Sequence, residues 1–521
     1  MELIKQRVHM NRCNSRENVR VTLDTDFNVP DIKPDARAVM QQKGEVVIEE
    51  VRIVDGKANI KGTLYFTILY AGEDEIPVCD MTGNIPIDEA VDLGCDTTRE
   101  DEITVHTTIE DLRSELINSR KFGIKAIVNM EVIAETIYDG EGAVDIEGDE
   151  SILKRRKNME ITRLILSKKD TLRVRDECKI PGTKDTIGRI LYDDVNLLEV
   201  ETRVGEDKLI LSGEASLFLI YLSSDETPQL NFYECVIPLS GEVNCGGCDE
   251  TNVVQAEVGI HSRELEVKSD EDGEDRVIDV EIVLQLAIKA FGEEQMELLT
   301  DFYSTKKECR PVFQTSYFEN LIMKNKSKTR VNGKIELNAS HPALQIWKVS
   351  GEVRVDEKRI VEDGVEVEGV IDINVLYQSA DDSVPLAAST GILPFEQHIQ
   401  IPDIVPGSDI RMNAGLEQIS GSLLGENEAD IKAVVVLDVL AFHNIEEPII
   451  ADFEMEELDC GARAKEPGLI GYVVKKGDEL WDIAKQFYTT IDTIMEINKM
   501  ESDMVHEGDV LLVMKEANCM S

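Results

Sequence analysis

The sequence predicts a mainly β protein, with three tandem β-sandwich or barrel-like domains followed by a small βααβ module. The first observation is a threefold repeat, in which a glycine is followed eight residues later by a tyrosine, with apolar residues alternating between them. The second is a strongly β-like run that closes each copy, from residues 123, 277 and 429. The third is a helix-containing pattern confined to the C-terminal end. The repeated pairs are Gly62 and Tyr70, Gly213 and Tyr221, and Gly369 and Tyr377.

The three copies are long enough to form domains of their own. Val, Ile and Leu at period two, bounded by Gly, Pro, Asp and Asn, predict half-buried strands. Several such strands in each copy favour a sandwich or an open barrel. Each copy is long enough to bury its own core, so we expect independent tandem domains rather than a solenoid. The predicted limits are 1–150, 155–320 and 321–460, with the C-terminal module at 468–516.

The repeated glycines and tyrosines receive a structural interpretation. We expect each glycine where a strand starts or bends, because a missing Cβ permits close backbone approach. Each tyrosine is expected to end an apolar strand with its hydroxyl near water.

Basic residues gather near the junctions of the copies, at 154–157, 168–169, 173–175, 306–307 and 324–330. On an otherwise acidic chain, such clusters can bind acidic faces of the same chain or of another copy. Solvated lysines on edge strands would produce the same pattern. The sequence leaves both interpretations open.

Charge and hydropathy narrow the classes of partner. The formal net charge of −48 excludes a general nucleic-acid binder, because phosphate contacts need Lys and Arg surfaces. Anionic membrane would also repel the chain, whereas basic partners or divalent cations would be attracted. The N-terminal residues contain no apolar signal region, and no run approaches the ~20 apolar residues of a transmembrane segment. We therefore expect a protein that stays in the cytoplasm.

The ten cysteines show no framework spacing, which predicts reduced thiols and no metal site. Cys245 and Cys248 form the one C-x-x-C pair. A zinc ribbon needs a second pair, and a redox motif should open a helix beside a strand. Neither pattern is visible, so we interpret the pair as a loop with incidental cysteines. We predict no cofactor.

The C-terminal module begins with an apolar strand at 472–474. Gly477 then turns the chain, and Asp478 is placed to cap a helix whose apolar residues recur at i, i+3, i+4 and i+7 from Leu480. Thr489 and Asp492 resemble a capping box at the start of a second helix. A last strand is expected at 510–514.

This module resembles a LysM module. The Y-x-V-x-x-G-D-x-L-x-x-I-A opening, Asn498 at the end of the second helix, and Gly508 with Leu511 stand at the spacing of that family. The resemblance implies binding of glycans that contain N-acetylglucosamine (GlcNAc), in a groove between two loops. Glu479 replaces the usual small hydroxyl in the first loop, and the second loop is acidic. These departures favour protein binding, with glycan binding and a vestigial module as alternatives.

We therefore predict a docking surface on the two loops and the adjoining helix face. Trp481 lies off the strict apolar stripe, so exposure beside methionines would make it a protein anchor. The alternative is that Trp481 packs against the strands of the module. The predicted groove and docking residues are Gly477, Asp478, Glu479, Leu480, Trp481, Asp482, Asn498, Met500, Met504 and Gly508.

The three copies resemble SPOCS domains of endospore-forming bacteria. The opening segment with Pro30-Asp-Ile-Lys-Pro34, together with the repeated strands, carries this resemblance. SPOCS domains followed by LysM are typical of spore coat morphogenetic proteins. The resemblance implies a scaffold in the mother-cell cytoplasm at the forespore surface. Its implied partners are a SpoIVA-like coat ATPase and other coat proteins, and self-association is a further option.

An enzymatic function finds little support. The seven histidines are isolated, and neither H-E-x-x-H, G-x-S-x-G nor a Walker A motif occurs, so no catalytic residue is assigned. A carboxylate pair of the glycosidase type stays open among 103 acidic residues. The rival hypotheses are a cortex hydrolase with a LysM anchor and a peptidoglycan-binding, wall-associated or phage-tail protein.

Overall fold

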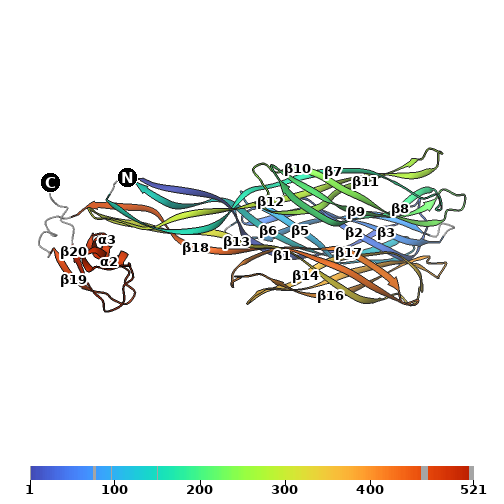
Figure 1. Ribbon diagram of the computed structural model, residues 1–521. Coiled ribbons are helices and arrows are strands. Elements are labelled where there is room, and N and C mark those ends of the chain that lie inside the picture. The colour runs from blue at the N-terminus through green and yellow to red at the C-terminus, as the bar shows by residue number, and fades with distance from the viewer. Residues whose placement is uncertain (1, 74–77, 95–96, 149–150, 459–467, 515–521) are drawn as a thin grey trace.

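The computed structural model describes residues 2–73, 78–94, 97–148, 151–458 and 468–514 of the chain (Figure 1). The regular elements described up to residue 457 are all β-strands. The two described helices lie in the C-terminal module. The elongated molecule consists of a wide body, a narrow stalk built from the ends of long strands, and the module beside the far end of the stalk (Figure 1). The predicted mainly β fold class is confirmed.

Each copy consists of two three-stranded antiparallel sheets. The first, last and fifth strands of a copy form a long sheet with the last strand in the centre, and the second to fourth strands form a short sheet in sequence order. The strands are β1 (Glu2–Asn28), β2 (Ala36–Val54), β3 (Lys57–Gly72), β4 (Cys79–Asp92), β5 (Glu102–Asn118) and β6 (Lys121–Glu147) in copy one; β7 (Ile152–Lys179), β8 (Ile187–Gly205), β9 (Lys208–Ser223), β10 (Leu230–Asn244), β11 (Val253–Ser269) and β12 (Asp275–Ser304) in copy two; and β13 (Lys307–Glu336), β14 (Ala343–Val361), β15 (Gly364–Ser379), β16 (Leu386–Gln400), β17 (Asp409–Leu423) and β18 (Glu428–Glu457) in copy three.

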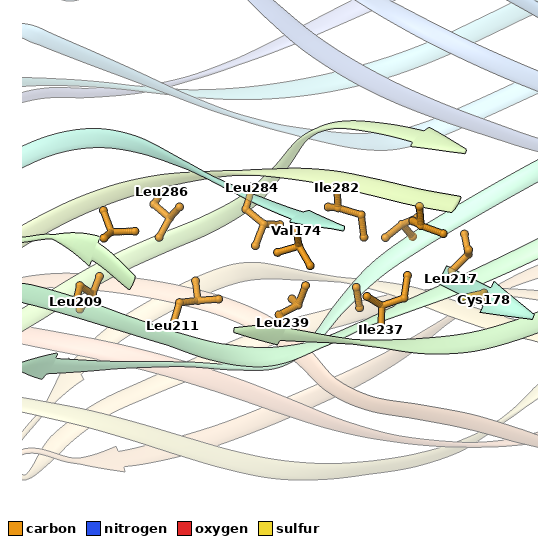
Figure 2. Packing of buried hydrophobic residues seen from close by; sticks show 14 of the residues in the cluster. Val174, Cys178, Leu209, Leu211, Leu217, Ile237, Leu239, Ile282, Leu284 and Leu286 are labelled. Carbon is orange, nitrogen blue, oxygen red and sulfur yellow. The ribbon is translucent and has the colours of Figure 1, made fainter. Parts of the chain in front are cut away.

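The core of each copy lies between its two sheets. In copy two, Val174 and Leu284 of the long sheet meet Leu211 and Leu239 of the short sheet (Figure 2). Ile282, Leu284 and Leu286 of this core occupy alternate positions of β12, as the period-two pattern predicts.

The repeated glycines lie opposite β-bulges of the neighbouring strand. Gly62 pairs with Ile48, and the register shifts between Ile48 and Glu50. A Cβ at Gly62, Gly213 or Gly369 would lie 2.7, 3.0 or 2.5 Å from the backbone of that neighbour. The glycines are therefore needed for close approach at a bulge in the middle of a pair of strands, rather than at a strand start.

The repeated tyrosines are fully buried, so the expectation that their hydroxyls lie near water is wrong. The hydroxyl of Tyr70 donates to the carbonyl of Pro34 at 3.2 Å, and that of Tyr221 donates to Asp185 at 3.0 Å. The hydroxyl of Tyr377 accepts from the backbone N–H of Asn338. Each tyrosine thus ties its strand to the loop that precedes the second strand of the copy.

The copies are not independent, because a further core contains residues of all three. It joins Leu69 of β3, Phe218 of β9 and Trp347 of β14, among others. Phe232 and Trp347, from copies two and three, stack with ring centroids 4.8 Å apart. Buried ion pairs accompany this core, including Lys43 of copy one with Asp194 of copy two. We therefore propose that the body folds as one unit made from three similar parts.

The stalk continues the long sheets beyond the body. Its core combines Met10 of β1, Ile161 of β7, Leu298 of β12 and Phe318 of β13. The predicted domain limits near 155 and 320 fall inside β7 and β13. From the strand bounds we propose limits near 150 and 306 instead, between the last strand of one copy and the first of the next.

Several basic residues bind other parts of the same chain, as the first interpretation of the clusters predicted. Lys157 pairs with Glu447 of copy three, and Lys169 pairs with Glu102 of copy one at 3.2 Å. The ammonium of Lys324 donates to a backbone carbonyl of copy two at 2.6 Å.

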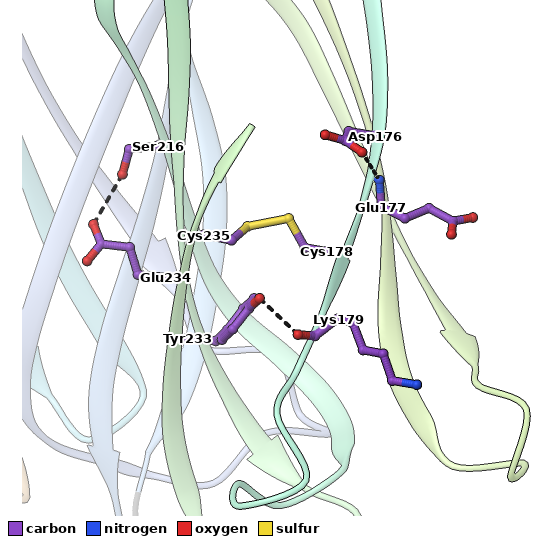
Figure 3. Close-up of a disulfide and its surroundings, with 8 residues drawn as sticks. All are labelled: Asp176, Glu177, Cys178, Lys179, Ser216, Tyr233, Glu234 and Cys235. Atoms are coloured by element: carbon purple, nitrogen blue, oxygen red, sulfur yellow. Dashed lines mark hydrogen bonds between the residues drawn. A yellow bond between two sulfur atoms is a disulfide. The ribbon is translucent and has the colours of Figure 1, made fainter. Parts of the chain in front are cut away.

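A disulfide joins Cys178 of β7 to Cys235 of β10, so the prediction that all cysteines are reduced is wrong at this pair (Figure 3). The two residues lie 57 apart in sequence and face each other across the two sheets of copy two, with Cα atoms 6.6 Å apart. No local spacing could indicate this pairing. Cys95, Cys460 and Cys519 lie outside the described residues.

Candidate functional site

The C-terminal module is a two-stranded sheet covered by two helices. Its strands β19 (Leu469–Val473) and β20 (Val510–Met514) pair antiparallel, and α2 (Leu480–Phe487) and α3 (Ile491–Asn498) lie between them in the sequence. Leu480, the first residue of the predicted apolar stripe, is buried in the core of the module. The other core residues include Val474, Ile483, Ala484, Ile494, Leu511 and Val513.

The first loop is fixed by Asp478. Its carboxylate accepts from the hydroxyl of Tyr472 at 2.7 Å and from the backbone N–H of Lys475 at 2.9 Å, and these bonds lower the pKa of Asp478. Gly477 has a φ of +90°, a conformation that favours glycine. Asp478 therefore ties the loop to β19 and does not cap α2, whose N-cap residue is Glu479.

The face of α2 that contains Trp481 lies against the stalk. Its indole N–H donates to Asp301 at 2.8 Å, and its ring packs edge-on against Tyr303 with centroids 4.9 Å apart. Lys485, one turn further along α2, donates to the same carboxylate at 2.6 and 2.8 Å. Trp481 is thus half-buried, and its predicted exposure is wrong because a partner 180 residues away in sequence covers it.

Two further contacts hold the module to the stalk. Glu479 pairs with Arg155 at 2.6 Å, and the buried hydroxyl of Tyr303 donates to the carbonyl of Thr489 at 2.8 Å. The two candidate residues Glu479 and Trp481 therefore serve an intramolecular contact. Asp482, which follows Trp481 in α2, is exposed.

Asn498 closes the edge of β20. Its amide donates to the carbonyl of Leu512 and its oxygen accepts from the Leu512 N–H, both at 2.8 Å. This side chain replaces the missing neighbouring strand. Thr490, rather than Thr489, is the N-cap of α3 and accepts from the N–H of Thr493 at 3.1 Å.

The second loop presents the exposed part of the candidate site. Met504 is 75% exposed at its centre, whereas Met500 is half-buried against the module core. Gly508 has a φ of +95° and begins the turn into β20. Glu501, Asp503 and Glu507 are exposed around Met504. The structure therefore divides the predicted set into three parts: residues that face the stalk, residues that stabilise the module itself, and an exposed acidic loop centred on Met504.

Cys245 and Cys248 lie in a turn of copy two. Both thiols are buried, and their sulfur atoms are 2.6 Å apart. Burial and the neighbouring thiol raise the pKa of Cys248 to about 12, so the thiol is not activated as a nucleophile. Within the part of the chain that the structure describes, no three His, Cys, Asp or Glu side chains gather as a metal site.

A charged cavity of about 820 Å³ lies between the three copies. Arg411, Lys289 and Glu135 are among its lining residues. Arg411 pairs with Glu319 within copy three at 2.9 Å, and Lys289 of copy two pairs with Glu135 of copy one, so both basic side chains have acidic partners. The cavity therefore belongs to the packing of the body.

Comparison with protein families agrees with the division into three similar copies and a C-terminal module. The family described as "SipL, SPOCS domain" matches residues 35–117, 186–268 and 342–424, one match in each copy. The LysM domain family matches residues 472–513. These matches show that the chain contains three SPOCS domains and one LysM domain. Its arrangement of three SPOCS domains and a C-terminal LysM domain is that of a SipL-like protein.

One curated relative shares a short segment. The uncharacterized protein YkzQ of Bacillus subtilis (strain 168) is 38% identical over 42 residues, which are 8% of this chain and 56% of that protein. The chain thus spans little more than half of that relative. No solved structure matches the chain.

The domains define the general class of the protein. SPOCS and LysM domains are non-catalytic modules, and they make the chain a sporulation-related, spore-associated protein with a module of the peptidoglycan-binding type. Among the described residues, no helix is long and apolar enough to cross a membrane.

Proposed function

We propose that this protein is a non-enzymatic scaffold of the spore coat, which docks a SpoIVA-like coat ATPase at the forespore surface from the mother-cell cytoplasm. The observation that carries the proposal is the acidic loop around Met504. An exposed methionine inside a ring of carboxylates is a suitable centre for a protein contact, since an apolar anchor with a charged rim is typical of interface hot spots.

The position of the LysM domain supports this proposal. Contacts through Trp481, Lys485 and Glu479 hold the domain at the far end of the stalk, away from the wide body. The loop around Met504 takes part in none of these contacts. A scaffold that holds its binding loop at the end of an extended stalk can reach a partner without obstruction by its own body.

The binding loop is tested with Met504→Glu in the full chain. We expect it to weaken binding of the purified SpoIVA-like ATPase at least about tenfold, since loss of a buried interface anchor commonly costs more than 1.4 kcal/mol. The matched control is Ile392→Glu, an equally large change at a body residue that is 58% exposed. The measurement is surface-based binding kinetics.

The alternative of glycan binding has its own outcome in the same experiment. Tight binding of chito-oligosaccharides, lost in Met504→Glu while ATPase binding stays unchanged, would contradict the docking proposal. Release of soluble muropeptides by the purified chain would contradict the non-enzymatic proposal and favour a cortex hydrolase.

A further inference from the structure

The outer face of the LysM sheet is apolar and exposed. Leu469 and Val473 of β19, with Val510, Leu512 and Met514 of β20, are 44% to 70% exposed. The alternate residues Leu511 and Val513 point into the module core and are buried. Packing against the stalk uses α2 and leaves this face open. We call these five side chains and Gly471 the apolar sheet face.

The pairing of the two strands places a projecting side chain, Leu512, beside a position without a side chain, Gly471. Leu469 lies opposite Met514, Val473 opposite Val510, and Gly471 opposite Leu512. Among the described residues, no atom lies within 4 Å of a Cβ built at Gly471, and the φ of Gly471 is not positive. Neither backbone conformation nor internal packing therefore requires a glycine here. Its effect is to leave a depression beside the exposed Leu512.

The apolar sheet face is also neutral. None of the ten residues of β19 and β20 is charged, although 30% of the chain is charged and its net charge is −48. Two copies of so acidic a chain repel each other over most of their surface. A neutral apolar face is a place where they can approach without bringing carboxylates together, and interface centres are depleted of charge in the same way.

We propose that the apolar sheet face binds the same face of a second copy of this chain. A two-fold axis that runs parallel to the strands and between them sets each Leu512 over the Gly471 of the other copy. The same rotation sets Leu469 over Met514 and Val473 over Val510. An isologous contact needs such self-complementarity, and face-to-face packing of two sheets provides its geometry.

The size of the face sets the strength of the contact. Strands of five residues span about 17 Å, so each copy contributes on the order of 200 Å², against the roughly 800 Å² per partner of a standard interface. Association through this face is therefore weak between two free chains. Many chains held together in a coat would strengthen it, because tethering raises the effective concentration of each face.

The test is analytical ultracentrifugation of the full chain over a wide concentration range. The wild-type chain should form dimers reversibly, and more readily as salt screens the repulsion between acidic bodies. Leu512→Glu should lower the association constant at least about tenfold, because it places a charge in the contact. A wild-type chain that stays monomeric at every concentration and salt would overturn the proposal.

Gly471→Val distinguishes a fitted contact from general stickiness. Its side chain enters open space and suits a strand, so the LysM domain should fold normally. The proposal expects weaker association, since the added side chain fills the depression that receives Leu512. Stronger association would overturn the proposal, because general hydrophobic adhesion would gain from the added apolar surface.

The experiment also separates this contact from docking of the coat ATPase. Met504→Glu lies on the second loop and should leave self-association unchanged even if it abolishes ATPase binding. If Leu512→Glu removes ATPase binding while the wild-type chain is monomeric, another protein covers the face, and the self-association proposal is wrong.

Discussion

The body and the junction between stalk and LysM domain are held by different amounts of buried surface. The body packs Phe218, Trp347 and many other side chains of the three SPOCS copies into a shared core. At the junction, one ring pair, two polar contacts to Asp301, a hydrogen bond from Tyr303 to Thr489 and one exposed ion pair join the LysM domain to the stalk. The difference indicates a body that unfolds as a unit and a LysM domain that can separate from it.

The two tryptophans report on the two regions separately. Trp347 lies in the shared core of the body, and Trp481 lies at the junction. Replacing either one by phenylalanine leaves a fluorescence signal from the other region, so unfolding of the body and separation of the LysM domain can be followed independently.

Removing a ring from the shared core should have the largest effect. Phe218 is fully buried, and its ring lies 6.1 Å from that of Phe232 and 6.5 Å from that of Tyr192. We expect Phe218→Ala to lower the free energy of unfolding of the body by about 4 kcal/mol. Denaturant titration should give one transition of the body, shifted to lower concentration.

Ile392→Ala is the matched surface control and should change stability by less than about 0.5 kcal/mol. Separate transitions for the three copies, with only copy two affected by Phe218→Ala, would show that the shared core does not couple them.

Removing one partner of a buried ion pair should have the next largest effect. Lys43→Met leaves Asp194 without its ammonium, and Asp194 is only 7% exposed. A buried charge without a partner costs about 3 kcal/mol. The loss should appear in the body transition at pH 7 and leave the Trp481 signal of the folded chain unchanged.

The pH dependence of stability tests the same ion pair. Burial alone would raise the pKa of Asp194, but Lys43, with Asn196, holds that pKa below its usual range. A lowered pKa stabilises the fold above the unfolded value of about 3.9, and this contribution disappears as pH falls through the folded pKa. Lys43→Met should raise the folded pKa of Asp194 and diminish this dependence, since only Asn196 and Lys348 then oppose the effect of burial. A pH profile parallel to that of the wild type would contradict the assignment.

The strands and the LysM domain could be predicted from sequence, because period-two and helical patterns are local. The sequence also contains a local indication of the shared core, which is a continuous apolar run within a strand that otherwise alternates. In β9 the run from Leu217 to Leu222 is apolar at every position, which is typical of strands buried on both faces. Phe218 and Ile220, on the second face, belong to the shared core.

The partners of the candidate site could not be predicted. The sequence predicts that Trp481 is an exposed anchor, because its position in the helix lies off the apolar stripe. Its cover consists of Asp301 and Tyr303, which come from the end of β12, and only the extended stalk brings that strand end to α2. A contact across such a sequence distance leaves no periodic signal.

Separating the LysM domain from the stalk should require a smaller change than disturbing the body. Asp301→Ala removes the acceptor of both Trp481 and Lys485. We expect a local cost of about 2 kcal/mol, because two polar groups lose their partner. In a Trp347→Phe background the Trp481 emission should shift to the red and become more accessible to quencher, while the body transition stays unchanged. An unaltered Trp481 spectrum would contradict the contact.

The smallest effect is expected at the exposed ion pair of the junction. Arg155 and Glu479 have side chains 44% and 57% exposed, so solvent screens their attraction and Glu479→Gln should cost less than about 1 kcal/mol. Glu479→Lys adds repulsion from Arg155, and we expect a slightly larger red shift of Trp481 emission that high salt diminishes.

If Glu479 contacts the coat ATPase directly, both substitutions should weaken binding at low and high salt alike. If Glu479 acts only by orienting the LysM domain, Arg155→Gln should weaken binding as much as Glu479→Gln does, and comparison of these two variants decides between the alternatives.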